Sequence, residues 1–176
     1  DVEREETAVY LCAGEESAET LPTLESVTVQ CHTEANLLRA FWAGARSYDV
    51  FVTFNGRAFT LPFLWYRSAA LGVQPSVEIA RQRYVAKQTL PYHVDLLDEF
   101  SNYGAVQRPS LALLCGALGI PNPSILSGEE AVGAYQAGEY GRVVEKAVGD
   151  VETIAAVYER WLECLAPVAF LNTIHY

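Results

Sequence analysis

Short apolar runs alternate along this chain with longer segments whose apolar residues recur every three or four positions. That alternation predicts a mixed α/β fold. Runs rich in β-branched and aromatic residues predict strands at 8–13, 26–32, 50–54 and 92–95. Helical spacing predicts helices at 34–43, 62–71, 110–118, 129–138 and 142–165. The last of these is either one long helix or two helices with a break at Gly149, and the first two strands are expected to form an antiparallel meander.

The stretch from Tyr48 to Ser68 carries the strongest local signal. Its apolar run predicts a buried strand, and the pair Asn55-Gly56 that follows is typical of a tight turn. Pro62 suits the first turn of a helix, and Thr60 is placed to cap that helix. A strand, a polar turn and a helix start in succession form a place where α/β proteins often bind ligands.

Two other segments allow two interpretations each. The irregular segment 74–90 holds three basic residues and Tyr84, and it is either a strip that lies along a phosphate backbone or a solvated loop. His93 and Asp95 share one face of a strand. They either form hydrogen bonds near an active cleft, or Asp95 caps the next helix while His93 is a structural histidine.

Composition narrows the class of protein. The 176 residues are 51% apolar and 19% charged, which favours a single globular domain spanning 1–176. The net charge of −10 has the wrong sign for a protein that coats nucleic acid, although a nuclease with a local basic strip remains possible. The four cysteines are widely spaced, which indicates reduced thiols and a cytoplasmic location. No apolar run is long enough to span a membrane, and no signal-peptide pattern is present, so no membrane partner is expected.

The run VTFNGRAFTLPFL resembles the second motif, FNGRxFDLPFL, of the predicted 3'-5' exonucleases related to the proofreading domain of family B DNA polymerases. These are DEDD-type members of the ribonuclease H-like superfamily. The segments HVDLL at 93–97 and LGIP at 118–121 resemble further family segments in the same order. The resemblance extends from about Ala8 to Trp161.

This resemblance implies a ribonuclease H-like mixed β-sheet flanked by helices. Asp1 and Glu3 correspond to the first motif and Asp150 to the third, which makes them the expected catalytic residues and ligands of Mg²⁺ or Mn²⁺ in two-metal hydrolysis. The strand that precedes the first motif in the family is expected to be missing or truncated. On composition alone, Asp1 and Glu3 belong to a solvated acidic terminus, and that interpretation stays open.

The expected ligand is the 3' end of single-stranded DNA or RNA. The resemblance implies that Asn55, Gly56, Arg57 and Phe59 contact the nucleic acid.

Two positions depart from the family pattern. Thr60 stands where the family has a metal-binding Asp, and Lys146 stands where it has a Tyr that orients water, with Glu145 at the position of a His variant. A neutral hydroxyl is a weaker ligand than a carboxylate, and an amine near carboxylates competes with a cation. We therefore expect weakened hydrolysis. The alternative is an inactive binding or assembly module with a protein partner. No P-loop or other catalytic motif supports a different enzyme class.

Overall fold

The computed structural model describes residues 1–176 except 2, 15–20, 80, 122–125 and 175–176. The described chain forms four strands, β1 (Thr7–Cys12), β2 (Val27–His32), β3 (Val50–Thr53) and β4 (Tyr92–Asp95). Its α-helices are α1 (Glu34–Ala45), α2 (Leu61–Ala70), α3 (Leu96–Phe100), α4 (Leu111–Leu118), α5 (Gly128–Gln136), α6 (Tyr140–Cys164) and α7 (Val168–Ile174). A π-helical segment (Gly56–Thr60) precedes α2, and a 3₁₀ turn (Val85–Lys87) precedes β4. The predicted α/β class is confirmed.

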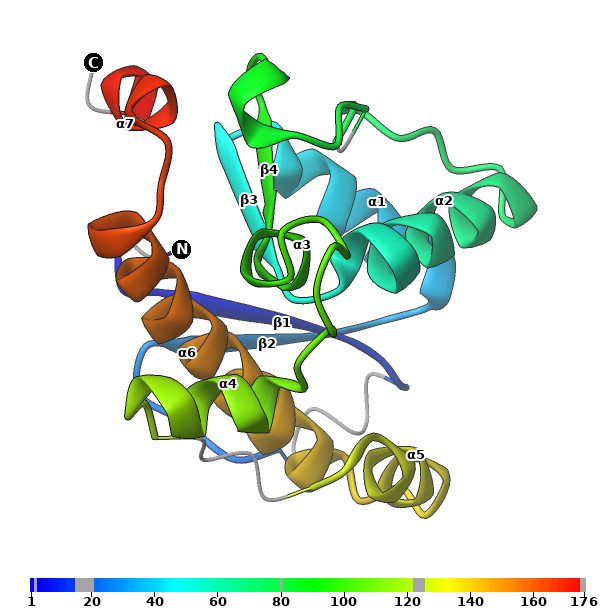
Figure 1. The fold of residues 1–176 in the computed structure, drawn as a ribbon. Helices are drawn as coiled ribbons and strands as arrows, with labels where there is room; N and C mark the ends of the chain where they lie inside the picture. The colour runs from blue at the N-terminus through cyan, green and yellow to red at the C-terminus, as the bar shows by residue number, and fades with distance from the viewer. Residues whose placement is uncertain (2, 15–20, 80, 122–125, 175–176) are drawn as a thin grey trace.

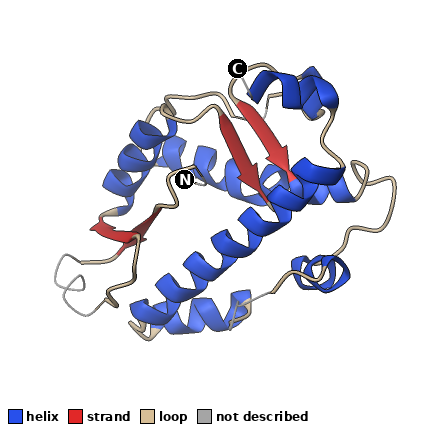
Figure 2. Cartoon of the chain, turned by 90° about the vertical axis from the view of Figure 1, so that its left-hand side faces the viewer, coloured by secondary structure: helices blue, strands red, loops and turns tan. Residues whose placement is uncertain are grey.

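The strands form two separate parallel pairs, β1 with β2 and β3 with β4. Figures 1 and 2 show the two pairs lying apart from each other. The expected antiparallel meander of β1 and β2 is therefore wrong: the two strands run in the same direction, with Thr7 opposite Val27 and Cys12 opposite His32. A single mixed sheet is not seen in the described part of the chain, and the ribonuclease H-like arrangement stays a prediction.

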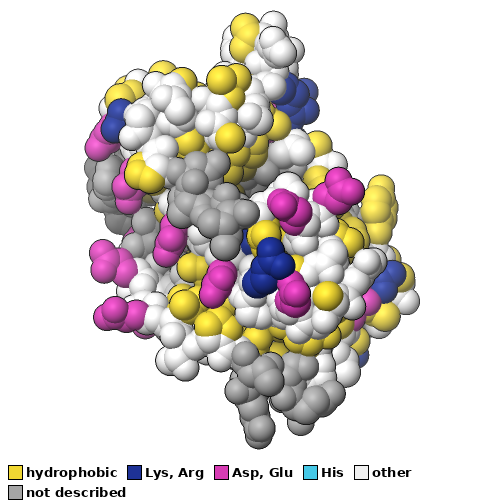
Figure 3. All heavy atoms as spheres, turned by 90° about the horizontal axis from the view of Figure 1, so that it is seen from below, with side chains coloured by type: hydrophobic (Ala, Val, Ile, Leu, Met, Phe, Trp, Pro, Cys, Tyr) yellow, Lys and Arg dark blue, Asp and Glu magenta, His cyan; other side chains and the backbone are white. Residues whose placement is uncertain are grey.

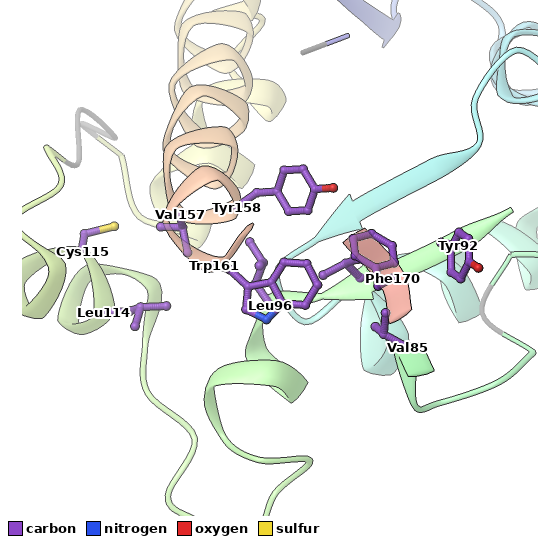
Figure 4. Packing of buried hydrophobic residues seen from close by; sticks show 10 residues of the cluster. Val85, Tyr92, Leu96, Leu114, Cys115, Val157, Tyr158, Trp161 and Phe170 are labelled. Carbon is purple, nitrogen blue, oxygen red and sulfur yellow. The ribbon is translucent and has the colours of Figure 1, made fainter. Parts of the chain in front are cut away.

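Helix α6 connects the two sheets. Near its N-terminal end, Val144 and Val148 pack with Leu11 of β1. Near its C-terminal end, Trp161 packs with Phe170 of α7 in a cluster that also holds residues of β4, α3 and α4 (Figure 4). The helix runs unbroken through Gly149, which is buried within it. One long helix, the first of the two predicted alternatives, is confirmed.

A third cluster joins α1, α2 and the loop that follows α2. Trp42 is 2% exposed, and its indole N–H donates to Ser68 Oγ at 2.9 Å, so the one polar atom of a large buried ring is satisfied. Arg67 of α2 donates to both carboxylate oxygens of Glu34 at 2.5 and 2.6 Å. These contacts fix α2, and with it the turn that precedes α2, against α1.

Two of the predicted helix N-caps are present and one is not. Ser110 caps α4 by accepting from the Leu113 N–H, and Asp95 caps α3 by accepting from the Leu97 N–H. Thr60 caps nothing, because the π-helical segment continues directly into α2 and holds Thr60 in helical geometry. None of the helices in the described ranges is both long and apolar enough to cross a membrane.

Candidate functional site

The turn at Asn55–Arg57 lies at the carboxyl end of the parallel pair β3–β4. Asn55 adopts the left-handed conformation, with φ of 64°, as the predicted turn requires. Gly56 approaches Thr53 so closely that an added Cβ would lie 2.4 Å from Thr53 Oγ1, so a side chain at position 56 would collide with β3. The carboxyl edge of a parallel sheet is where polar side chains and free backbone groups converge.

Asp95 holds this turn in place from the neighbouring strand. Its Oδ1 accepts from the Asn55 N–H at 2.8 Å, and its Oδ2 accepts from the Arg57 N–H at 2.8 Å. The same carboxylate caps α3 through the Leu97 N–H at 3.1 Å. Asp95 is 2% exposed, so one buried carboxylate organises the turn and the start of a helix together.

His93 lies beneath the turn and bonds to Thr53 and Arg57 rather than to Asp95. Its Nδ1 lies 3.3 Å from Arg57 Nη2, and its Nε2 lies 2.8 Å from Thr53 Oγ1. Because a guanidinium only donates, Nδ1 accepts, and Nε2 carries the proton that it donates to Thr53. Burial, reinforced by the charge of Arg57, lowers the pKa of His93 to about 4, so the ring is neutral at physiological pH. The predicted cap by Asp95 is confirmed, whereas a purely structural role for His93 stays a prediction.

Three arginines gather around Asp98 on α3. Its Oδ2 lies 3.2 Å from Arg57 Nε, and its Oδ1 lies 3.1 Å from Arg83 Nη2 and 3.7 Å from Arg108 Nη2. The Asp98 side chain is 5% exposed, whereas those of Arg83 and Arg108 are 46% and 44% exposed. Arg108 Nη2 also donates to Asn55 Oδ1 at 3.2 Å, which ties the cluster to the turn.

Aromatic rings lie beside the cluster and on the helical segment that follows the turn. Tyr84 and Tyr103 pack edge to face with centroids 4.6 Å apart, and the Arg83 guanidinium lies 5.9 Å from the centre of the Tyr103 ring. On the π-helical segment and α2, Phe59 and Phe63 stack with centroids 6.0 Å apart. Phe59 is 67% exposed, so its ring is accessible to a planar ligand, as the predicted contact requires.

Asp1 and Glu3, the expected metal ligands of the first motif, lie at the N-terminus and not in the Asp98 cluster. Asp1 accepts from the Arg4 N–H at 3.1 Å and lines a hollow of about 450 Å³ with Glu6, Ser26 and Tyr48. Glu3 is exposed. The exposed Glu3 fits a solvated terminus, whereas the Asp1 side chain is only 14% exposed and pairs with Arg4, so both interpretations of these two residues stay predictions.

Asp150 pairs with Lys146 one turn earlier on α6, with Nζ 2.7 Å from Oδ2. Thr60 is exposed, and no hydrogen bond or ion pair in the described ranges joins Asp150 to Thr60, Asp1 or Glu3. Among the described residues, no three or more His, Cys, Asp or Glu side chains form a group able to hold a metal ion. As arranged here, the expected ligands do not fit a two-metal centre, which needs several carboxylates around each pair of ions.

Sequence reasoning missed the roles of Asp98, Tyr103 and Arg108. Asp98 lies in the first turn of α3, three residues after its N-cap Asp95, where acidic residues are common, so its sequence position gave no sign of the arginine contacts. Arg108 lies 53 residues from Asn55 in the chain, and no local pattern indicates their contact.

Residues 5–167 match a family model described as predicted 3'-5' exonuclease related to the exonuclease domain of PolB. A search of curated proteins found no match to the chain. The family match covers every element from β1 to α6 and confirms the resemblance inferred from the motifs.

Proposed function

We propose that this chain, which belongs to the family of predicted 3'-5' exonucleases related to the PolB exonuclease domain, binds the 3' end of single-stranded nucleic acid and hydrolyses it only weakly. The contact between Lys146 Nζ and Asp150 Oδ2 at 2.7 Å carries the second part of this proposal. A fixed ammonium on that carboxylate occupies the side from which a divalent cation would approach, and it neutralises the charge that attracts such a cation.

The residue at position 60 adds to this effect. Thr60 offers a neutral hydroxyl where the family motif has a carboxylate, so one negative charge is missing in addition to the one that Lys146 neutralises. Asp1, Glu3 and Asp150 as ligands of Mg²⁺ or Mn²⁺ stay a prediction that a metal titration tests. Because their present arrangement does not fit such a site, we derive no reaction step through a metal.

The turn and its aromatic neighbour are the proposed contacts for the nucleic acid. Asn55, Gly56 and Arg57 lie at the carboxyl edge of β3 and β4, and Phe59 presents an exposed ring on which a terminal base stacks. Base stacking and phosphate contacts depend little on sequence, so we expect binding without strong sequence preference. A cytoplasmic location stays a prediction.

A second candidate is a domain that has lost hydrolysis entirely and serves in binding or assembly. The ion pair between Lys146 and Asp150 also favours this candidate, because a paired carboxylate needs no metal to be stable. The two candidates differ in whether any cleavage occurs, and an activity assay separates them.

The test is a cleavage assay with a labelled single-stranded oligonucleotide in Mn²⁺ and in EDTA. We compare the wild type with the double variant Thr60→Asp/Lys146→Tyr, which restores the family residues, and with Thr23→Asp/Arg46→Tyr, which makes the same change of charge at two exposed positions. Faster Mn²⁺-dependent shortening by the double variant alone supports a weakened centre. Wild-type cleavage as fast as that of the double variant contradicts it. Absence of any oligonucleotide binding by the wild type contradicts the proposal as a whole.

A further inference from the structure

We infer that Arg57, Arg83 and Arg108, gathered around the buried Asp98, form an anion site that takes the phosphodiester backbone of a single strand. This inference rests on the proposed function and deepens it, because it assigns backbone contacts to two arginines that lie far from the recognised motif in the sequence. Arg83 lies in the loop before β4, and Arg108 lies in the loop before α4.

The charge of the cluster is the first argument. Three guanidiniums meet one carboxylate, and His93, which contacts Arg57, is neutral because its pKa is lowered to about 4. The Asp95 carboxylate, which accepts from the Arg57 N–H, is the second negative charge beside the arginines. Three positive charges therefore face two negative ones, which leaves an excess of one positive charge in a chain whose net charge is −10. Figure 3 shows acidic side chains scattered over the face seen from below. Such a local excess on an acidic protein is expected to attract an anion.

The geometry of the two outer arginines is the second argument. In the described part of the chain, the hydrogen bonds and ion pairs of Arg83 and Arg108 all run through Nη2, to Asp98, the Tyr103 carbonyl and Asn55. Each guanidinium has five N–H donors in a planar fork, and each of these side chains is nearly half exposed. Asp98 thus binds Nη2 of each guanidinium and leaves the other N–H donors facing solvent, which suits bidentate contact with phosphate oxygens.

The position of the cluster is the third argument. Arg108 bonds to Asn55, and Arg57 is itself part of the turn, so the anion site is continuous with the proposed contacts for the strand end. Tyr84 and Tyr103 lie beside Arg83 and offer ring faces next to the charges. Alternating cationic and aromatic groups are typical of surfaces that bind single strands.

A purely structural role for the cluster is the competing explanation. In that case the arginines would only tie two loops to α3, and their removal would lower stability without changing how binding responds to salt. Each lost phosphate contact, in contrast, lowers the salt slope of log K against log[salt] by about 0.7 for a single strand. The same relation gives a loss of affinity of about eightfold at roughly 50 mM salt and about threefold at roughly 200 mM for each contact.

The experiment measures binding of a fluorescent single-stranded oligonucleotide by anisotropy, in EDTA so that cleavage plays no part, over a series of salt concentrations. The variants are Arg83→Gln, Arg108→Gln and their combination. The control is Arg46→Gln, which removes the same charge from an exposed residue at the end of α1. Thermal unfolding of each variant verifies that it is folded.

We expect each single variant to lose affinity and salt slope by the stated amounts, the double variant to lose about sixtyfold at roughly 50 mM salt, and the control to change little. Variants that bind like the wild type would overturn the anion site while the proposed function stands. Equal losses in the variants and in Arg46→Gln would also overturn it, because they would indicate a general charge effect. A wild type that binds no oligonucleotide would overturn both.

Discussion

We predict that the stability of the turn at Asn55–Arg57 depends more on Asp95 than on any other residue. It accepts three backbone N–H groups at 2.8, 2.8 and 3.1 Å while only 2% exposed. A hydrogen bond to a charged group contributes about 1.5–3 kcal/mol. Three such bonds set an upper limit of about 4.5–9 kcal/mol, and relaxation of the turn toward water reduces the expected loss for Asp95→Ala to about 3–5 kcal/mol. That loss is a large share of the roughly 5–15 kcal/mol by which domains are stable.

The measurement is urea unfolding followed by circular dichroism, together with thermal unfolding. A loss of about 3–5 kcal/mol corresponds to a fall in Tm of roughly 6–20 °C for a chain of this size. Asp95→Asn retains one acceptor oxygen but presents an amide N–H₂ to a backbone donor, so its loss should be smaller, about 1.5–3 kcal/mol. Asp49→Ala is the control, because Asp49 is exposed and its truncation should change stability by less than about 0.5 kcal/mol.

The order of the three variants tests the reasoning. A loss below about 1 kcal/mol for Asp95→Ala would refute the assignment of three strong bonds to this carboxylate. An Asp95→Asn variant less stable than Asp95→Ala would mean that a donor conflict, and not the missing acceptors, decides the stability of the turn.

Three further predictions concern other parts of the molecule. The pKa of His93 is about 4 in the folded protein and about 6.5 when the ring is free. As the pH falls below about 6.5, the unfolded chain therefore takes up a proton that the folded protein does not, and the free energy of unfolding decreases until the pH reaches about 4. Urea unfolding over that range should show His93→Gln losing less stability than the wild type, by at most about 1.4 kcal/mol per pH unit, and parallel pH profiles would contradict a buried neutral ring. Phe170 is 1% exposed against Trp161, so Phe170→Ala should cost about 3–5 kcal/mol in the same assay; a loss under about 1 kcal/mol would show that α7 is not part of the core. Ser127 and Glu130 form a capping box at α5, and Ser127→Ala should cost about 1 kcal/mol, whereas an unchanged denaturation midpoint would indicate that α5 does not need its cap.

The local sequence alone was enough to predict most of the secondary structure and the family. The strand–turn–helix order around Asn55, most of the helices, the caps at Ser110 and Asp95, and the family were evident in the residues, because periodicity, turn preference and capping act between near neighbours. Helix α7 was not predicted. The same local view failed at Thr60, because the π-helical segment and α2 form a continuous helical path that no short pattern indicated.

Tertiary structure decided which of these elements meet. The parallel pairing of β1 with β2 could not be deduced from the two strands alone, and the contacts of Asp98 with Arg83 and Arg108 depend on where two loops lie against α3. That Asp150 and Asp1 belong to no group of three or more potential metal ligands, within the residues that the structure describes, is likewise a property of the whole fold. Contacts between residues distant in sequence arise from burial of the shared cores, and the free energy of that burial is not encoded in any short segment.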